Sequence, residues 1–515
     1  MIGALRERLA PRLPRWLRTP AWASFGLGLL AALALPPFYL LPLLWLAVPG
    51  LLRLLTAAGS WRRALWIGFC FGFGFNLLGL FWVTEPMLIT IDQFWWAIPF
   101  AAPGLAAAVA GYMLIPALLV YRLKPGFGLV LVFAGIMVLM NLAQQFLFTG
   151  FPWNYWGTDW VMPGRLGTVM IQPAAVIGMH GLTLLTIILA GLPLCGRRGW
   201  AGAALLLVLW AGFGLARTAS GPAAERALTI AMIQPDFAVP GGFSQAALQA
   251  RWRRDLAMTQ QAMQQAGPGP KAIIWPETAS PALLQSDAQA RAAIAAIAGD
   301  TPVLAGSFRF TKSGQLRNSL VVVRGAGPAP AYYDKWKLVP FGEYTPSIIP
   351  FKITPGSGFT PGPGPRTLHV QGIPPVGPLI CYESIFSGEI VDRTDRPAWL
   401  VNISDNAWFG DTTGPRQDFA TTRLRAVEEG LPLVVDTNSG ISAFIGPHGT
   451  VHAQLGLDRR GILVHKLQVA LPPTIFGRFG LWLDLFLSLA SIILGFAWLR
   501  LACFLGQNHK KLSSS

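Results

Sequence analysis

Eight apolar runs of membrane-spanning length constrain this chain more than any other feature. A helix needs about 20 mostly apolar residues to cross the hydrocarbon core of a bilayer. The 515 residues are 53% hydrophobic and only 12% charged, whereas soluble domains have about 25% charged residues. We therefore expect much of the chain to contact lipid. The expected spans are residues 22–37, 38–56, 64–84, 94–121, 127–147, 168–194, 200–216 and 479–504.

The basic residues predict how these spans are oriented. Cytoplasmic links of membrane proteins are enriched in Lys and Arg, and here five arginines precede the first span while the links at 53–63, 122–124 and 197–198 are also basic. Because further spans follow at once, an uncleaved first span fits better than a cleaved signal peptide. Seven spans then place residues 218–470 outside the cytoplasm, and an eighth returns the tail.

The net charge of +16 does not indicate nucleic-acid binding, because the basic residues flank apolar segments and form no single stripe. The predicted organisation has three parts. A membrane domain with seven spans covers residues 1–217, an outer domain covers 218–470, and a last span with a cytoplasmic tail covers 471–515.

The outer block alternates between strand-like and helix-like patterns. Such interleaving over about 240 residues indicates one layered α/β domain. The expected strands are 227–233, 271–275, 302–309, 319–324, 376–381, 398–404, 431–436 and 461–469, and the expected helices are 243–265, 286–298 and 414–430. Residues 345–366 are too rich in Pro and Gly for a regular element. They form either a loop that touches lipid or covers a pocket, or an ordinary surface loop.

Three side chains of the outer block form a complete set for covalent acyl transfer. Cys381 is the single cysteine of this block and ends an apolar strand. As a thiolate it would be the nucleophile, with Glu277 as its general base. The ammonium of Lys335 and the backbone N–H of Tyr382 could stabilise the tetrahedral oxyanion. The alternative for Cys381 is a small buried hydrophobe.

The motifs around these residues resemble the nitrilase superfamily and, more narrowly, the apolipoprotein N-acyltransferases of bacterial inner membranes. They are Ile-Trp-Pro-Glu277, Lys335-x-x-Leu-Val-Pro-Phe-Gly-Glu343-Tyr, Ile-Cys381-Tyr-Glu383 and Asn402-x-Ser-Asp-x-Ala-Trp408-Phe-Gly. The resemblance extends to Phe151-Pro-Trp-Asn, Arg425-Ala-Val-Glu428 and Asn438-Ser-Gly-Ile-Ser442. It therefore covers nearly the whole chain.

The resemblance implies a membrane helical bundle of about eight spans that carries an α-β-β-α sandwich outside the cytoplasm, in the periplasm of a bacterium. It implies a Glu–Lys–Cys triad at Glu277, Lys335 and Cys381. The implied supporting or substrate-binding residues are Glu343, Tyr382, Glu383, Asn402 and Trp408.

The implied reaction is ping-pong and uses no cofactor or metal. Cys381 would take an acyl chain from a phospholipid such as phosphatidylethanolamine and hold it as a thioester. The amine of an S-diacylglyceryl-cysteine apolipoprotein would then accept the chain. Two positions depart from the family pattern: Asp418 stands where a His is expected, and Gln234-Pro-Asp236 replaces the more usual Gln-Gly-Asn.

Two other functions stay open at the level of sequence. A membrane-tethered amidase or nitrilase would form the same acyl-enzyme and pass the acyl group to water. A transporter or lipid-binding scaffold would have an inactive outer domain. The small number of charges within the spans argues against a solute pathway, and the intact set of Glu277, Lys335 and Cys381 argues against an inactive domain.

Overall fold

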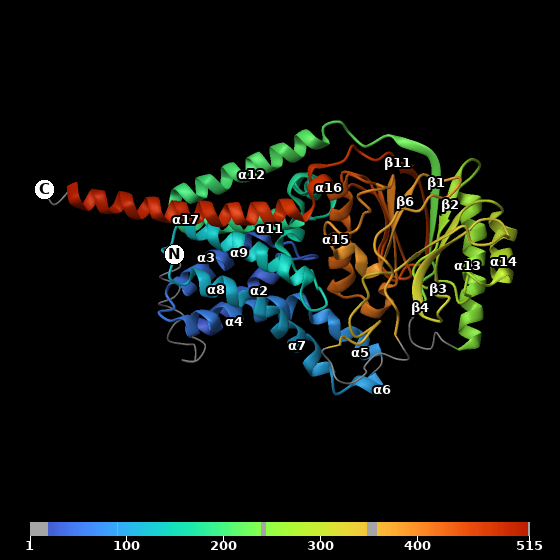
Figure 1. Cartoon of the computed structure of the whole chain (residues 1–515), viewed down its shortest axis with the longest axis horizontal. Helices are drawn as coiled ribbons and strands as arrows, with labels where there is room; N and C mark the ends of the chain where they lie inside the picture. Colours follow the sequence, from blue (N-terminus) through green and yellow to red (C-terminus); the bar gives the residue numbers. More distant parts are fainter. Residues whose placement is uncertain (1–18, 90, 238–243, 348–357, 513–515) are drawn as a thin grey trace.

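The computed structural model describes residues 19–89, 91–237, 244–347 and 358–512. The chain forms a helical bundle joined to an α/β domain, and the C-terminal helix α17 (Leu481–Leu512) returns along the bundle (Figure 1). The five N-terminal arginines and residues 348–357 of the Pro/Gly-rich segment lie outside the described residues, so the predictions made for them stay predictions.

The described residues contain fewer span-length helices than the eight expected. By length and composition, four stretches could cross a membrane, namely 98–120, 127–146, 174–218 and 481–505, or five if the bent pair 61–79 and 81–89 counts as one span. The first two expected spans form shorter apolar helices. The helices of the bundle are α2 (Pro20–Ala32), α3 (Leu44–Thr56), α4 (Trp61–Gly79), α5 (Glu85–Ile89), α6 (Ile91–Phe94), α7 (Ile98–Ala110), α8 (Leu114–Val120), α9 (Phe127–Phe146), α10 (Gly164–Met170), α11 (Ala174–Gly191) and α12 (Gly196–Thr218).

The 45-residue stretch 174–218 is two helices rather than one. A 3₁₀ turn (Leu192–Cys195) separates α11 from α12, which begins at Gly196 with a φ of 70°. The first part of α11 lies beside the α/β domain, where the N–H of Met179 donates to Glu428 at 2.7 Å. The far end of α12 leads directly into that domain. The chain therefore leaves the α/β domain and comes back to it within this stretch.

Glycines allow α2 and α4 to pack with their backbones almost in contact. A Cβ added at Gly28 would lie 2.1 Å from the carbonyl oxygen of Phe71, and one added at Gly74 would lie 2.4 Å from that of Phe25. Small residues at such crossings are typical of helix pairs in membranes, where close packing replaces the hydrophobic effect as the driving force.

The α/β domain contains two mixed sheets. The six-stranded sheet has the order β11-β1-β2-β3-β4-β5, and the five-stranded sheet has the order β10-β9-β8-β7-β6. All eight expected strands are present, and the three strands β5, β9 and β10 were not expected. The strands are β1 (Glu225–Gln234), β2 (Lys271–Ile274), β3 (Val303–Phe310), β4 (Leu316–Val323), β5 (Ala331–Asp334), β6 (Val376–Ile380), β7 (Trp399–Ser404), β8 (Leu433–Thr437), β9 (Ser442–Ile445), β10 (Val451–Leu455) and β11 (Gly461–Gln468).

The two sheets pack face to face and helices cover their outer faces (Figure 1). Helices α13 (Gln245–Gln265) and α14 (Ala288–Ala298) cover the six-stranded sheet, and α15 (Thr413–Glu429) covers the other. The expected α-β-β-α layering is therefore present. Helix α15 also lies against α11 and the short helix α16 (Ile475–Phe479), so this layer is the one in contact with the bundle.

We predict that Gly28→Ala destabilises the bundle. The added methyl group would meet the backbone of α4, and overpacking of this kind costs about 1–3 kcal/mol. Gly26→Ala is the matched control, because a Cβ at Gly26 has no atom within 4 Å. Thermal unfolding in detergent should give a lower Tm for Gly28→Ala and an unchanged or slightly raised Tm for Gly26→Ala. Equal Tm values would contradict the close packing of α2 on α4.

Candidate active site

The three predicted catalytic side chains come from the ends of strands in both sheets. Glu277 lies three residues beyond β2, Lys335 directly follows β5, and Cys381 directly follows β6. Lys335 Nζ lies 3.0 Å from Glu277 Oε1 and 3.0 Å from Glu343 Oε1, and its side chain is only 1% exposed. The fold therefore places one buried ammonium between two carboxylates.

Backbone and amide donors hold both carboxylates in place. Asn318 Nδ2 on β4 donates to Glu277 Oε1 at 2.7 Å, and the N–H of Asp405 donates to Glu277 Oε2 at 2.9 Å. The N–H of Val339 donates to Glu343 Oε2 at 2.7 Å. A buried ion pair offsets its desolvation only when the remaining lone pairs find donors, and these contacts supply them.

Cys381 occupies a strained turn at the end of β6. Its φ of 53° lies in the left-handed region, which is uncommon for a residue with a Cβ and is often found at functional sites. Two hydrogen bonds stabilise this turn. Ser384 Oγ donates to the carbonyl of Cys381 at 3.1 Å, and Thr422 Oγ1 of α15 lies 2.8 Å from Ser384 Oγ. The conformation is thus fixed by α15.

The surroundings keep the thiol protonated at rest. Burial raises the pKa of Cys381, and the charges of Glu277 and Asp418 raise it further, while Lys335 acts in the opposite direction; the net pKa is well above the usual value. For Lys335, burial alone would lower the pKa, but Glu277 and Glu343 outweigh it and raise the pKa well above its usual range. The site therefore contains a thiol and a permanent ammonium, and the thiol needs a base when it attacks.

Glu383 connects the strand ends that carry the nucleophile and the lysine. Its carboxylate accepts from the N–H of Ile380 at 2.7 Å, the N–H of Trp336 at 2.6 Å and the hydroxyl of Tyr333 at 2.9 Å. Burial raises the pKa of Glu383 to about 7 against these donors. Glu383 thus links the end of β5 to the end of β6. It thereby fixes the positions of Lys335 and Cys381, which follow these two strands.

Tyr382 attaches the nucleophile turn to the helical bundle. Its hydroxyl donates to the carbonyl of Gly150 at 2.8 Å, and its ring lies in an apolar cluster with Trp82 and Trp153. Both indole N–H groups donate to Gln417 Oε1 of α15, at 3.0 and 2.8 Å. The residue beside the nucleophile is therefore packed on the membrane part of the chain.

The other two predicted residues lie at the end of β7 and beyond it. Asn402 is fully buried, and neither polar atom of its side chain has a hydrogen-bond partner among the described residues. Alternation along the strand puts it on the same face as Leu400, which packs in the cluster under α15. Trp408 is 36% exposed and follows Asp405, the residue whose N–H binds Glu277.

Sequence reasoning missed Asn318 and Asp405 as contacts of Glu277. The strand predicted at 319–324 begins one residue after Asn318, and Asp405 lies 128 residues from Glu277 in the chain. The one usable signal was the position of Asp405 at the end of an apolar strand, within the motif that runs from Asn402 to Trp408.

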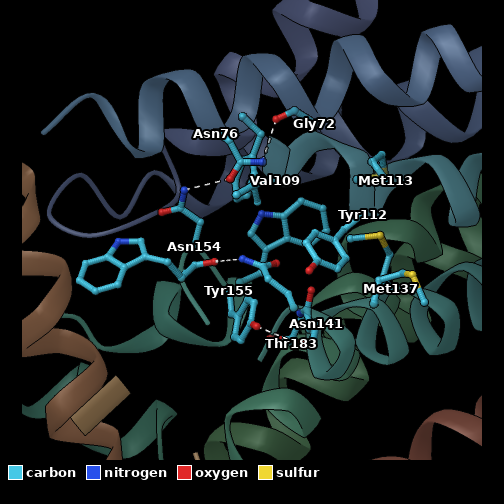
Figure 2. Close-up of a pocket in the computed structure, with 15 residues that line it drawn as sticks. Gly72, Asn76, Val109, Tyr112, Met113, Met137, Asn141, Asn154, Tyr155 and Thr183 are labelled. Carbon is cyan, nitrogen blue, oxygen red and sulfur yellow. Dashed lines mark hydrogen bonds between the residues drawn. The ribbon is translucent and has the colours of Figure 1, made fainter. Parts of the chain in front are cut away.

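A separate cavity of about 50 Å³ lies within the bundle (Figure 2). Its wall includes Asn76 of α4, Asn141 of α9, Tyr155 and Thr183 of α11, and the hydroxyl of Tyr155 donates to the carbonyl of Asn141 at 2.7 Å. None of the predicted catalytic side chains lines it. The cavity is a feature of the membrane part, large enough for a few water molecules.

Comparison with known proteins decides the family. The model of the apolipoprotein N-acyltransferase N-terminal domain matches residues 27–192, and that of carbon-nitrogen hydrolase matches 208–471. The apolipoprotein N-acyltransferase of Bradyrhizobium diazoefficiens is 35% identical over 92% of this chain and 94% of its own length. That of Brucella melitensis is 34% identical over 96% and 97%. The chain belongs to the apolipoprotein N-acyltransferase family. It is an acyltransferase with a nitrilase-like domain and membrane helices.

Solved structures that resemble this acyltransferase match about half of its length. Nit3 of Saccharomyces cerevisiae, a member of the nitrilase superfamily, has 16% identity and a TM-score of 0.37 over 48% of this chain and 91% of that chain. An amidase from Nesterenkonia sp. has 19% identity and a TM-score of 0.37 over 48% and 93%. The family assignment rests on the sequence match with the two relatives named above, which extends over both the helical bundle and the α/β domain.

We predict that Lys335→Met slows alkylation of Cys381 and destabilises the acyltransferase. Loss of the ammonium removes the charge that lowers the pKa of the thiol, so less thiolate is present at a given pH. It also leaves Glu277 and Glu343 buried without a cation, which typically costs about 3–5 kcal/mol. Iodoacetamide rates as a function of pH and thermal unfolding measure the two effects.

The exposed Lys312 provides the control. Lys312→Met should change neither the alkylation rate nor the Tm. A Lys335→Met protein with the alkylation profile of the unmodified enzyme would show that Lys335 does not act on the thiol.

Proposed function

We propose that Cys381 takes an acyl chain from a membrane phospholipid and passes it to the terminal amine of an S-diacylglyceryl-cysteine apolipoprotein. One observation carries this proposal: the nucleophile turn is docked on the membrane helices through Tyr382 and Gly150 while its thiol lies within electrostatic range of Glu277 and Lys335. A lipid substrate needs both the chemistry and that location.

In the first half-reaction the thiol attacks the ester carbonyl of the phospholipid. Glu277 takes the thiol proton as the S–C bond forms, and the ammonium of Lys335 with the N–H of Tyr382 stabilises the oxyanion. The ester C–O bond then breaks, and the lysophospholipid leaves with the proton from Glu277. The product is a thioester on Cys381.

In the second half-reaction the acceptor amine attacks the thioester carbonyl. Glu277 takes a proton from the nitrogen, Lys335 again stabilises the oxyanion, and the C–S bond breaks. Glu277 returns its proton to the thiolate. Because a thiolate leaves more readily than an amine, the intermediate collapses toward the amide, and the enzyme regains its starting state.

We also propose where in the cell the reaction takes place. Eight membrane crossings would place the α/β domain, residues 218–470, in the periplasm of a bacterium and the basic links in the cytoplasm, with the enzyme in the inner membrane. The break between α11 and α12 supports two crossings within residues 174–218, in line with the expected spans 168–194 and 200–216. Phosphatidylethanolamine would then be an available donor in the outer leaflet, at the level of Cys381.

Hydrolysis of the same acyl-enzyme is the alternative within this chemistry, and a non-catalytic scaffold is the alternative outside it. The contacts between the Cys381 turn and the bundle favour acyl transfer between lipids, because an amidase acting on a soluble substrate has no need of them. The buried charges at Lys335, Glu277 and Glu343 favour catalysis, because burying charges carries a desolvation cost that a purely structural domain can avoid.

We predict a covalent acyl adduct on Cys381. Purified protein incubated with phosphatidylethanolamine and no acceptor should gain the mass of one acyl chain, release lysophospholipid and lose the adduct on treatment with hydroxylamine. Cys381→Ala should show none of these changes, because the nucleophile is gone. Cys503→Ala, which removes an exposed cysteine of α17, should behave like the unmodified enzyme.

A second step separates transfer from hydrolysis. A diacylglyceryl-cysteine peptide should discharge the adduct as an amide faster than water does. Discharge to free fatty acid at the same rate with and without peptide would favour the amidase. Absence of both adduct and lysophospholipid would eliminate the phospholipid donor.

A further inference from the structure

Asp418 faces the nucleophile turn from α15 but takes no part in the reaction described above. It lies one helical turn before Thr422, and residues four apart share a helix face. Thr422 contacts Ser384, which in turn holds the carbonyl of Cys381. The charge of Asp418 also acts on Cys381. Asp418 is therefore a further carboxylate near the nucleophile turn.

Among the carboxylates around the thiol, Asp418 is held by neither a cation nor a backbone N–H in the described part of the chain. Glu277 and Glu343 are paired with Lys335. Asp405 accepts from the side chain of Asn438 at 3.1 Å and from a backbone N–H. Among the described residues, Asp418 pairs with no cation; it accepts a long hydrogen bond of 3.3 Å from Asn406 Nδ2 and also interacts with the hydroxyl of Ser384. It can thus receive a cationic group from a substrate.

The acceptor substrate of the proposed reaction brings a cationic group to the Cys381 thioester. The acceptor arrives with a primary amine that is mostly protonated at neutral pH, because α-amino groups have pKa values of about 7.7–8.0. The donor ester brings no charge to the carbonyl that Cys381 attacks. A carboxylate near the thioester that pairs with no cation therefore suits the charged amine of the acceptor. It does not suit the uncharged ester carbonyl of the donor.

We propose that Asp418 binds the ammonium group of the acceptor beside the Cys381 thioester and takes one of its protons. This inference rests on the proposed function. One N–H bond breaks and an O–H bond forms on Asp418, which leaves a neutral amine. The amine then attacks the thioester and gives its second proton to Glu277, the thiolate leaves and receives that proton, and Asp418 releases its own to solvent.

The electrostatics of Asp418 suit this role. Burial raises its pKa to about 6, the amide of Asn406 acts against the rise, the charge of Glu277 adds to it and that of Lys335 opposes it. At neutral pH the carboxylate is thus ionised and able to form an ion pair. Its basicity is still closer to that of an amine than an ordinary aspartate's, so proton transfer is less unfavourable.

The test separates the two half-reactions in the full-length enzyme. Protein is loaded with an acyl chain from phosphatidylethanolamine, freed from donor, and mixed with increasing concentrations of a diacylglyceryl-cysteine peptide while the adduct is followed by intact mass. Asp418→Asn keeps the shape of the side chain and can still contact Asn406. It should load at the rate of the unmodified enzyme, and its thioester should react normally with uncharged hydroxylamine.

Discharge of the Asp418→Asn thioester by the peptide should require more peptide than discharge of the unmodified enzyme. We expect the half-saturating peptide concentration of Asp418→Asn to rise by about ten- to hundred-fold, the usual effect of losing one hydrogen bond to a charged group. Asp411→Asn is the matched control, since Asp411 is exposed and pairs with Arg416 at 2.6 Å. It should leave both half-reactions unchanged.

Three results would overturn the inference. Discharge of Asp418→Asn by the peptide at the unmodified rate and concentration would show that Asp418 does not bind the acceptor. Loss of loading in Asp418→Asn alone would assign the residue to the first half-reaction or to folding. An equal slowing with peptide and hydroxylamine would indicate a general distortion. If the unmodified enzyme also failed to load, the proposed function itself would fall.

Discussion

The buried ammonium of Lys335 is the interaction on which the rest of the site depends. An ion with 1% of its side chain exposed is tolerated only with opposite charge beside it, and Glu277 and Glu343 each approach it to 3.0 Å. Each carboxylate needs further donors, which Asn318, Asp405 and Val339 supply. Because these residues come from both sheets and from the loops between them, the charged group can form only when the whole sandwich is folded.

A second constraint is the attachment of the sandwich to the bundle. Gln417 receives two indole N–H groups, and Tyr382 reaches the carbonyl of Gly150. Farther along α15, Glu428 accepts from the N–H of Met179, where α11 is broken at Gly178. The same helix thus holds the nucleophile turn on one side and the membrane helices on the other. Under the proposed function, this arrangement would direct a chemistry shared with amide hydrolysis to lipids, because the Cys381 turn is attached to the membrane helices.

The sequence predicted the strands well and the contacts between them poorly. Cys381 was placed at the end of a strand because an apolar run stops there, and the structure confirms that position. Apolar patterns report local burial, so they also placed Glu277 just beyond an expected strand, whereas Lys335 was found from its motif because β5 was missed. They carry no information on which strand ends meet, and the contact between Asn318 and Glu277 joins residues 41 apart. Composition likewise gave eight apolar runs, whereas α2 and α3 have 13 residues each, because Pro, Gly and 3₁₀ turns interrupt regular helix in ways that hydropathy does not detect.

Kinetic competence tests most directly whether the thioester on Cys381 lies on the route from phospholipid to amide. Enzyme in vesicles would be given isotopically labelled phosphatidylethanolamine for a few turnovers and then chased with unlabelled donor in the presence of the acceptor peptide, with the label on Cys381 and on the peptide followed by rapid quench. We predict that label leaves Cys381 at the rate at which it enters the peptide, with no loss to fatty acid. Label that entered the peptide while the thioester persisted would contradict the account, because the acyl chain would then have another route.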